Sequence, residues 1–231
     1  MSISPLLNTG IYPLPRAARL IGANPRAVSR WMHGYQRKGQ DGLRRTTAPL
    51  WKTQLADEDF SVPAVGFRDL MELRFVNAFV QAGVSLHVIK ATIDSARGLW
   101  KTDYPLTLRR FRTDGKVIFE SAVNESGDEV LTDVRKRQVV FTHIIKPALY
   151  AGIQYDGDVA VIWHPQDAKG IVLDPAQRFG APVVTGTGIT TDTLFATYEA
   201  EGRDRKTTAR IFEIDPQQVD AAVRFEERLR A

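Results

Sequence analysis

The strongest constraint on the fold is the spacing of small and apolar residues between Leu14 and Tyr35. Gly22 follows Ala18 by four positions, and apolar Val28 and Trp31 come six and nine positions after that glycine. This spacing predicts a helix-turn-helix, because the small alanine lets two helices cross closely and the glycine permits a tight turn. Asn24 and Pro25 predict the start of the second helix, which we expect to reach about His33 with Val28, Trp31 and Met32 inward. An ordinary helical hairpin is the alternative.

The outward face of that second helix carries side chains suited to DNA. Arginine is the usual donor to guanine, and serine contacts base edges or phosphates. Beyond Gly34, the Asp41-Gly42 turn separates two basic arms, which predicts a β-hairpin wing that lies against the DNA backbone. The predicted DNA-binding residues are Arg26, Ser29, Arg30, His33, Tyr35, Arg37, Lys38, Arg44 and Arg45. His33 is equally compatible with a half-buried helix end.

The positive charge of the chain is concentrated in its first 55 residues. They hold nine basic side chains and one acidic side chain, although the whole chain has a formal net charge of only +4. The rest is therefore net acidic. Such a distribution attracts polyanions to one end of the molecule. A solvated, solubilising face is the alternative interpretation.

Composition excludes several other classes of protein. A chain of 231 residues with 43% hydrophobic and 25% charged residues is globular and long enough for two or three domains. It has no cysteine, which excludes disulfides, a thiol nucleophile and cysteine-based zinc sites. Its four histidines are scattered, so we expect no metal and no cofactor. No signal peptide or bilayer-length apolar stretch is present, which favours a soluble, cytoplasmic protein.

The middle of the chain gives weaker signals. Asp114-Gly115 lies between two apolar-alternating runs, which predicts a β-hairpin from about Leu108 to Glu120. We expect a loop over 121–133, a helix over 138–150 and a strand within 152–163. Asp156-Gly157-Asp158 lacks the further carboxylates of a calcium loop and predicts a turn.

The C-terminal segment predicts a small helical domain. Residues 185–188 contain two glycines but lack a complete phosphate-binding motif, so they predict a tight turn between two short strands. A helix should begin near Thr190 to Asp192 and end at Gly202. A second helix should hold Ala209, Ile211 and Phe212. A third should start at Asp215-Pro216 with Val219, Ala222 and Phe225 inward. The unit resembles a second helix-turn-helix, but it is acidic and therefore more suited to packing or dimerisation than to DNA.

The N-terminal hundred residues resemble a MerR-like winged-helix domain. After the wing, Leu70, Leu73 and Phe79 have helical spacing, and Gly83-Val84-Ser85 breaks that helix before a second one, to about Ala96. Arg68-Asp69-Leu70 followed by Glu72-Leu73 matches the entry to the post-wing helix of that family. The chain lacks the cysteines and the long terminal coiled-coil helix of MerR metal sensors.

The last sixty residues resemble VapB-like antitoxins of type II toxin-antitoxin modules. The matching residues include Asp174-Pro175, Phe179-Gly180, Pro182-Val183-Val184, Gly186-Thr187 and Ile214-Asp215-Pro216. This chain has Gly188 where the family usually has arginine. The expected fold is mainly α with small β elements (α+β). The expected domains are a winged-helix domain over 1–100, a connecting α+β region over 101–164 and an antitoxin domain over 165–231.

The resemblance implies a non-enzymatic antitoxin that neutralises a PIN-like ribonuclease toxin and represses its own operon as a homodimer on double-stranded DNA. PIN-like sites are carboxylate clusters that hold divalent metal, so a basic side chain could compete there. Arg224, Arg228 and Arg230 are the candidates, although each also suits a solvated helix end. Two alternatives stay open. One is a stand-alone winged-helix regulator without a toxin partner, and the other is an enzyme with an unrecognised site in the middle region.

Overall fold

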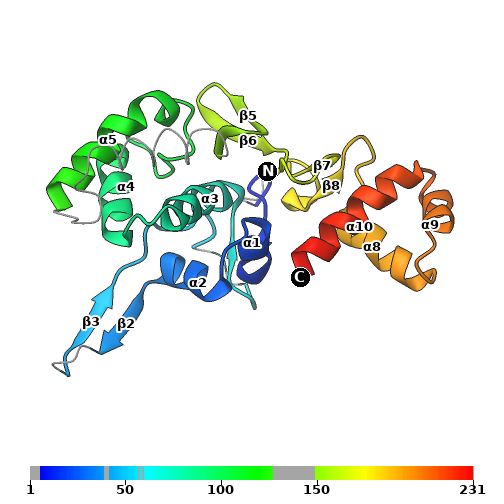
Figure 1. Ribbon diagram of the computed structural model, residues 1–231, viewed down its shortest axis with the longest axis horizontal. Helices are drawn as coiled ribbons and strands as arrows, with labels where there is room; N and C mark the ends of the chain where they lie inside the picture. Colours follow the sequence, from blue (N-terminus) through cyan, green and yellow to red (C-terminus); the bar gives the residue numbers. More distant parts are fainter. Residues whose placement is uncertain (1–5, 39–41, 57, 59, 127–148, 231) are drawn as a thin grey trace, which may run out of the picture. The chain divides into compact units, whose positions relative to one another are not determined.

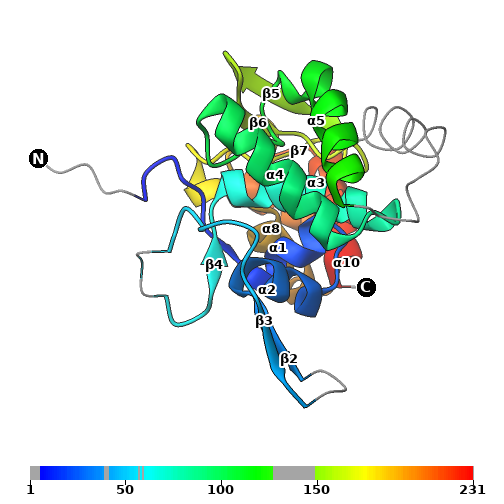
Figure 2. The ribbon, with the colours of Figure 1, turned by 90° about the vertical axis from the view of Figure 1, so that its left-hand side faces the viewer.

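The computed structural model describes residues 6–38, 42–56, 58, 60–126 and 149–230, apart from the side chains of Arg37 and Ser126. The chain forms two compact units. The N-terminal unit holds residues 13–150 and 157–159, and the C-terminal unit holds residues 1–12, 151–156 and 160–231. Both units are helical with two-stranded sheets, which confirms the predicted α+β class (Figures 1 and 2). Within the described residues, no helix has the length and apolarity needed to cross a bilayer.

The N-terminal unit begins with two short helices and a hairpin, as the spacing of its residues predicts. Longer helices follow, and two of them, α3 (Phe67–Gln81) and α4 (Leu86–Trp100), lie on either side of the Gly83-Val84-Ser85 break. The fourth helix runs past Ala96 to Trp100, where Lys101 in a left-handed conformation ends it. The elements are α1 (Leu14–Leu20), α2 (Pro25–His33), β2 (Tyr35–Lys38), β3 (Arg44–Thr47), β4 (Ala64–Val65), α3 (Phe67–Gln81), α4 (Leu86–Trp100) and α5 (Phe111–Ser126), preceded by β1 (Tyr12–Pro13).

Aromatic side chains of α3 and α5 form the centre of this unit. Phe75 contacts Phe111 edge to face, with 6.3 Å between ring centroids, and Phe79 stacks on Phe119 at 5.4 Å. All four rings are buried. Such pairs stabilise a fold beyond the area that they bury. They fix α5 against α3, and α4 packs along α5 as well.

The hairpin predicted around Asp114-Gly115 is wrong, because these residues lie in the first turns of α5. Phe111, Ile118, Phe119 and Ala122 are buried at helical spacing, and this tertiary burial outweighs the local turn signal of the Asp-Gly pair. Packing explains why a glycine, Gly115, is found within this helix. A Cβ at this position would lie 2.8 Å from the Phe111 ring, so the missing side chain leaves room for that ring.

The other predictions for the middle region have mixed outcomes. The loop predicted over 121–133 is wrong for 121–126, which continue α5, and its remainder lies outside the described residues. The helix predicted over 138–150 also lies outside them, except for Leu149 and Tyr150, which are helical. The strand within 152–163 is confirmed as a hairpin of β5 (Ile153–Asp156) and β6 (Val159–Trp163). Gly157-Asp158 forms its turn, as predicted.

The C-terminal unit contains a two-stranded sheet and three helices. They are β7 (Ile171–Val172), β8 (Val183–Val184), α8 (Thr191–Ala200), α9 (Arg205–Phe212) and α10 (Pro216–Arg230), with a short 3-10 turn, η3, at Arg178–Gly180. The turn predicted at 185–188 is confirmed, because Val184 N–H donates to Ile189 O across it at 3.0 Å. Phe195, Tyr198, Ala209, Val219 and Val223 form the helical core. Ile211 is half exposed.

A sharp corner precedes β8. Arg178, Phe179 and Gly180 all have positive φ, between 48° and 78°. The buried hydroxyl of Tyr12 donates to Gly180 O at 2.8 Å, and Ile11 N–H donates to Phe179 O at 2.9 Å. Burial raises the pKa of the Tyr12 hydroxyl well above its usual range, and the negative charge of Asp174 adds to this effect. The N-terminal residues 11 and 12 therefore hold this corner in place.

Candidate nucleic-acid interface

The turn between α1 and α2 has the geometry that the Ala18 to Trp31 spacing predicts. Ala18 is completely buried, and Ala23 N–H donates back to its carbonyl at 2.8 Å. Gly22 adopts φ +66°, which ends α1 without strain. The side chain of Asn24 accepts from Arg26 N–H at 2.9 Å and caps α2.

The second helix has one buried face and one exposed face. Val28, Trp31 and Met32 are buried, as predicted. Arg26, Arg30 and His33 are exposed and Ser29 is half-buried, so this part of the predicted site is on the surface. The guanidinium of Arg30 lies 5.5 Å from the centre of the Tyr35 ring. That contact orients the arginine and leaves its donors available. His33 Nδ1 lies 3.1 Å from Ser29 O, which ties the imidazole to the last turn of the helix.

The predicted wing is confirmed as the β2–β3 hairpin, which extends from α2 in Figure 2. Its register places Lys38 opposite Arg44 and Arg37 opposite Arg45. Lys38, Arg44 and Arg45 are exposed. Like charges directly opposite one another weaken a hairpin. An anionic ligand would relieve this repulsion, so the hairpin has the charge arrangement of a surface that binds a polyanion.

A hollow of about 370 Å³ lies between α2, the base of the wing and α4. Arg30 and Tyr35 contribute to its lining, together with His87 and Lys90 from the first turns of α4. Lys90 Nζ also contacts Asp94 at 2.5 Å. We did not predict His87 and Lys90 from sequence. The available signal was their spacing of three residues directly after the Gly83-Val84-Ser85 break, which places both near one face of a helix.

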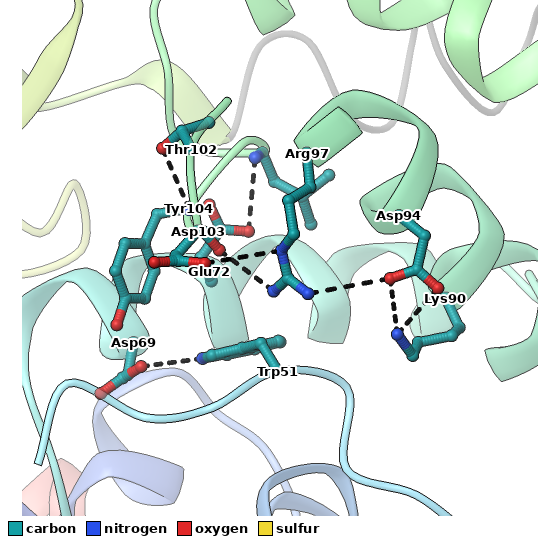
Figure 3. A network of polar contacts seen from close by, with 10 residues as sticks. Trp51, Asp69, Glu72, Lys90, Asp94, Arg97, Thr102, Asp103 and Tyr104 are labelled. Carbon is teal, nitrogen blue, oxygen red and sulfur yellow. Dashed lines mark hydrogen bonds and ion pairs between the residues drawn. The ribbon is translucent and has the colours of Figure 1, made fainter. Parts of the chain in front are cut away.

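A buried carboxylate joins the segment after the wing to α3. Asp69 accepts from Trp51 Nε1 at 2.8 Å, Thr53 Oγ1 at 2.5 Å, Gln54 N at 3.0 Å and Gly66 N at 2.9 Å (Figure 3 draws the Trp51 bond). Burial raises the pKa of Asp69, and these hydrogen bonds oppose the shift. Asp69 therefore fixes the chain that returns from the wing to the helical core.

Glu72, one turn further along α3, is also buried. It accepts from Thr107 N at 3.0 Å, Thr107 Oγ1 at 3.1 Å and Leu106 N at 3.3 Å. Burial raises its pKa to about 8, against the effect of these hydrogen bonds. On α4, Arg97 lies 3.8 Å from Asp94 and 3.9 Å from Asp103 (Figure 3). These contacts hold the loop after α4 beside the core.

The three arginines predicted at the C-terminus have different environments. Arg224 is exposed. Arg228, one turn later, pairs with Asp167 and lies 5.2 Å from the Phe225 ring centre. Arg230 lies only 3.9 Å from the Phe195 ring centre. The structure therefore brings Arg224 and Arg228 to one surface of α10, whereas Arg230 packs against α8.

A metal ion needs a close arrangement of ligating side chains. No three histidine, aspartate or glutamate side chains in the described ranges come close enough to hold an ion. The surface of α2, the wing and the start of α4 presents arginine, lysine, histidine and tyrosine side chains, which are suited to nucleic-acid phosphates and bases.

The fold and this surface define a winged helix-turn-helix protein. Residues 10–93 match a family described as "Putative DNA-binding HTH domain", and residues 171–225 match "Protein of unknown function (DUF433)". One relative of the chain is named "Putative antitoxin VapB45" and comes from Mycobacterium tuberculosis. It is 28% identical over 192 residues, which are 78% of each chain. These matches confirm the predicted resemblance to VapB-like antitoxins with a helix-turn-helix domain.

A solved structure has the same fold. The crystal structure of Rv2018 from Mycobacterium tuberculosis aligns with a TM-score of 0.64 over 92% of this chain and 96% of that chain, at 19% identity. At this identity the likeness concerns the fold. The alignment with the solved structure includes residues of both units, some of which lie outside the ranges that the two family descriptions match.

Proposed function

We propose that the chain is an antitoxin that represses its own promoter by binding double-stranded DNA through α2 and the β2–β3 wing. The observation that carries this proposal is the set of exposed cations on these two elements. Arg26 and Arg30 lie on the exposed face of α2, and Lys38, Arg44 and Arg45 lie on the adjoining hairpin. Arg26, Ser29, Arg30 and His33 would face the major groove, and Tyr35, Arg37, Lys38, Arg44 and Arg45 would contact the backbone or minor groove.

The hollow beside Arg30 supports a further backbone contact. His87 and Lys90 line it together with Arg30, Tyr35 and Thr47, so a phosphate there would meet donors from α2, the wing and α4. The Arg30–Tyr35 contact holds one of those donors in place. We propose that a homodimer binds two half-sites, because helix-turn-helix proteins read palindromic DNA in this way.

Fluorescence anisotropy with a duplex of the chain's own promoter tests DNA binding. The expected complex is specific over a scrambled duplex, and its affinity falls by roughly 0.9 log unit per log unit of salt for each phosphate contact. Lys206→Ala is a suitable control, because this exposed lysine belongs to α9 in the other unit. Equal affinity for promoter and scrambled duplexes would contradict operon-specific repression.

We propose that the same protein neutralises a PIN-like ribonuclease toxin. The support is the 28% identical relative, which is named as an antitoxin, and the fold shared over most of the chain. Arg224, Arg228 and Arg230 are the proposed toxin-binding residues, and Arg224 is exposed on α10. Recovery of the tagged protein from its native host at moderate salt should yield a small nuclease-like protein in stoichiometric amount. Recovery of promoter DNA without such a protein would refute the proposed neutralisation of a toxin.

A further inference from the structure

A groove of about 330 Å³ lies on the C-terminal unit between α10 and the loop from β6 to β7. The loop contributes Gln166 to Lys169, and α10 contributes the remaining side chains. Ala168, Ala221 and Phe225 supply its apolar surface. The charged atoms come from three cations and one acid: Lys169, Arg224, Arg228 and Asp167.

The three cations of this groove differ in the contacts that their side chains make. Arg228 pairs with Asp167 and is stacked on the Phe225 ring. Within the part of the chain that the structure describes, Lys169 and Arg224 have no hydrogen-bond or ion-pair partner for their side chains. Asp167 thus shows how a carboxylate binds in the groove, since its own carboxylate already contacts the guanidinium of Arg228. Lys169 and Arg224 remain for a second carboxylate.

The surroundings of the groove favour a protein carboxylate over nucleic acid. On α10, Asp220 and Glu227 flank Arg224 at four residues before and three residues after, so both lie on nearly the same helix face. Asp167 adds a third negative charge at the rim, where it is 68% exposed. Asp220 pairs with Arg205 and Asp167 pairs with Arg228, so these two acids offset cations nearby. Lys169 and Arg224 are the remaining cations of the lining, which suits one side-chain carboxylate better than a phosphodiester chain with a charge at every phosphate. The apolar floor suits the methylene groups of such a side chain.

We infer that this groove receives an aspartate or glutamate side chain of the nuclease partner, bound between Lys169 and Arg224. The inference rests on the proposed antitoxin function and identifies where the partner docks. It differs from insertion of an arginine into the partner's site, because here the partner's acid enters a groove of this chain. Arg228, which Asp167 and Phe225 hold in place, supplies the inner wall.

Zero-length cross-linking of the unmodified complex provides the first test. A water-soluble carbodiimide converts a carboxyl group into an O-acylisourea. The neutral amine of Lys169 then attacks the acyl carbon, which forms the amide bond, breaks the acyl C–O bond and releases the urea. The full-length chain, purified together with the partner that it recovers from the native host, should yield an amide between Lys169 and an aspartate or glutamate of that partner. Lys206 on α9 is an exposed lysine outside the groove and serves as the internal control.

Charge reversal provides the second test. Lys169→Glu and Arg224→Glu should each weaken partner binding by about 10-fold to 100-fold, because like charges would meet across the interface. Lys206→Glu makes the same change of charge outside the groove and should leave partner binding unchanged. All three variants should bind promoter DNA as the parent chain does, which also shows that they fold.

The outcomes separate the two proposals. If no nuclease-like partner is recovered with the parent chain, both the antitoxin function and the docking groove are overturned. If a partner is recovered but cross-links avoid Lys169, or Lys169→Glu and Lys206→Glu bind it equally, only the docking groove is overturned. Should a charge-reversed variant fail to fold, the cross-link on the unmodified protein still decides.

Discussion

Gly34 connects α2 to the wing, and its replacement by alanine should damage both stability and DNA binding. Its backbone adopts φ 70° and ψ −174°, a region that only glycine occupies readily. A Cβ at this position would also overlap the backbone carbonyl oxygen of Thr47 at the base of β3. Gly22 in the α1–α2 turn is a matched comparison, because it has φ +66° and nothing lies within 4 Å of the place that a Cβ would take.

The two glycines differ in backbone conformation and in the space around them, so alanine should cost more at Gly34 than at Gly22. In Gly22→Ala the alanine must adopt the left-handed conformation but meets no other atom, so the loss of stability should be about 1 to 2 kcal/mol. In Gly34→Ala the alanine must adopt a conformation that glycine alone occupies readily, and its methyl group overlaps the Thr47 carbonyl. The two effects together should lower stability by about 3 to 5 kcal/mol. In a chain of this size each kcal/mol lowers Tm by about 2 to 4 °C. Gly34→Ala should therefore unfold roughly 4 to 8 °C below Gly22→Ala, from a difference of about 2 kcal/mol.

Thermal unfolding of the two variants and promoter binding by anisotropy measure these effects. Because strand β3 must move to admit the methyl group, Gly34→Ala should also lose wing contacts, and its salt dependence should fall by about 0.9 log unit for each phosphate lost. Equal melting temperatures for the two variants would show that the Thr47 overlap costs no stability, and an unchanged salt dependence for Gly34→Ala would show that the wing keeps its phosphate contacts.

Further variants test the site and the buried acid. Arg26→Ala and Arg30→Ala should each cost about 1 to 3 kcal/mol on the promoter and relax sequence preference, as measured with substituted duplexes; a uniform loss on all duplexes would contradict base reading. Arg44→Ala should weaken promoter and scrambled duplexes alike and reduce the salt slope by about 1, and a selective loss on the promoter would contradict a backbone contact. Burial raises the pKa of Glu72 from 4.5 to about 8, so the folded chain keeps a proton that the unfolded chain has lost, and stability should fall as pH rises from 4.5 to about 8. Glu72→Gln should flatten this fall in unfolding experiments at pH 5 and 8; an unchanged pH dependence would contradict the assignment.

The helix-turn-helix and the wing could be predicted because their signals are local. The cap at Asn24, the turn at Gly22 and the buried stripe of Val28, Trp31 and Met32 all depend on residues close in sequence. The same holds for α8 and α10, which begin at the predicted residues. Short-range turn and capping signals thus predicted where these helices begin.

The middle region could not be predicted from local signals. Asp114-Gly115 has the composition of a hairpin turn, yet Phe111 and Phe119 contact α3 rings that are more than 30 residues away in sequence. Those contacts favour a helix, and no short pattern reveals them. The contribution of His87 and Lys90 to the hollow beside Arg30 was missed for the same reason, since it depends on how α4 packs near the wing.

The C-terminal arginines show the same limit. Sequence named Arg224, Arg228 and Arg230 together as candidates, but Arg230 packs on the Phe195 ring and Arg228 pairs with Asp167. The loop that carries Lys169 and Asp167 lies more than 50 residues before these arginines, and only the fold reveals that it forms a groove with α10. The sequence therefore identified the C-terminal helix as a candidate for toxin binding, and the structure added Asp167 and Lys169, which lie across the groove from it.

A chain that neutralises a nuclease must stop the cleavage of RNA by the purified partner. The partner recovered with this chain would be separated from it and assayed on RNA alone and with increasing amounts of the full-length chain. We expect cleavage to stop near a stoichiometric ratio of parent chain to partner, and the Lys169→Glu variant to inhibit cleavage much less at the same ratio. Undiminished cleavage in the presence of excess parent chain would show that the chain does not neutralise this nuclease.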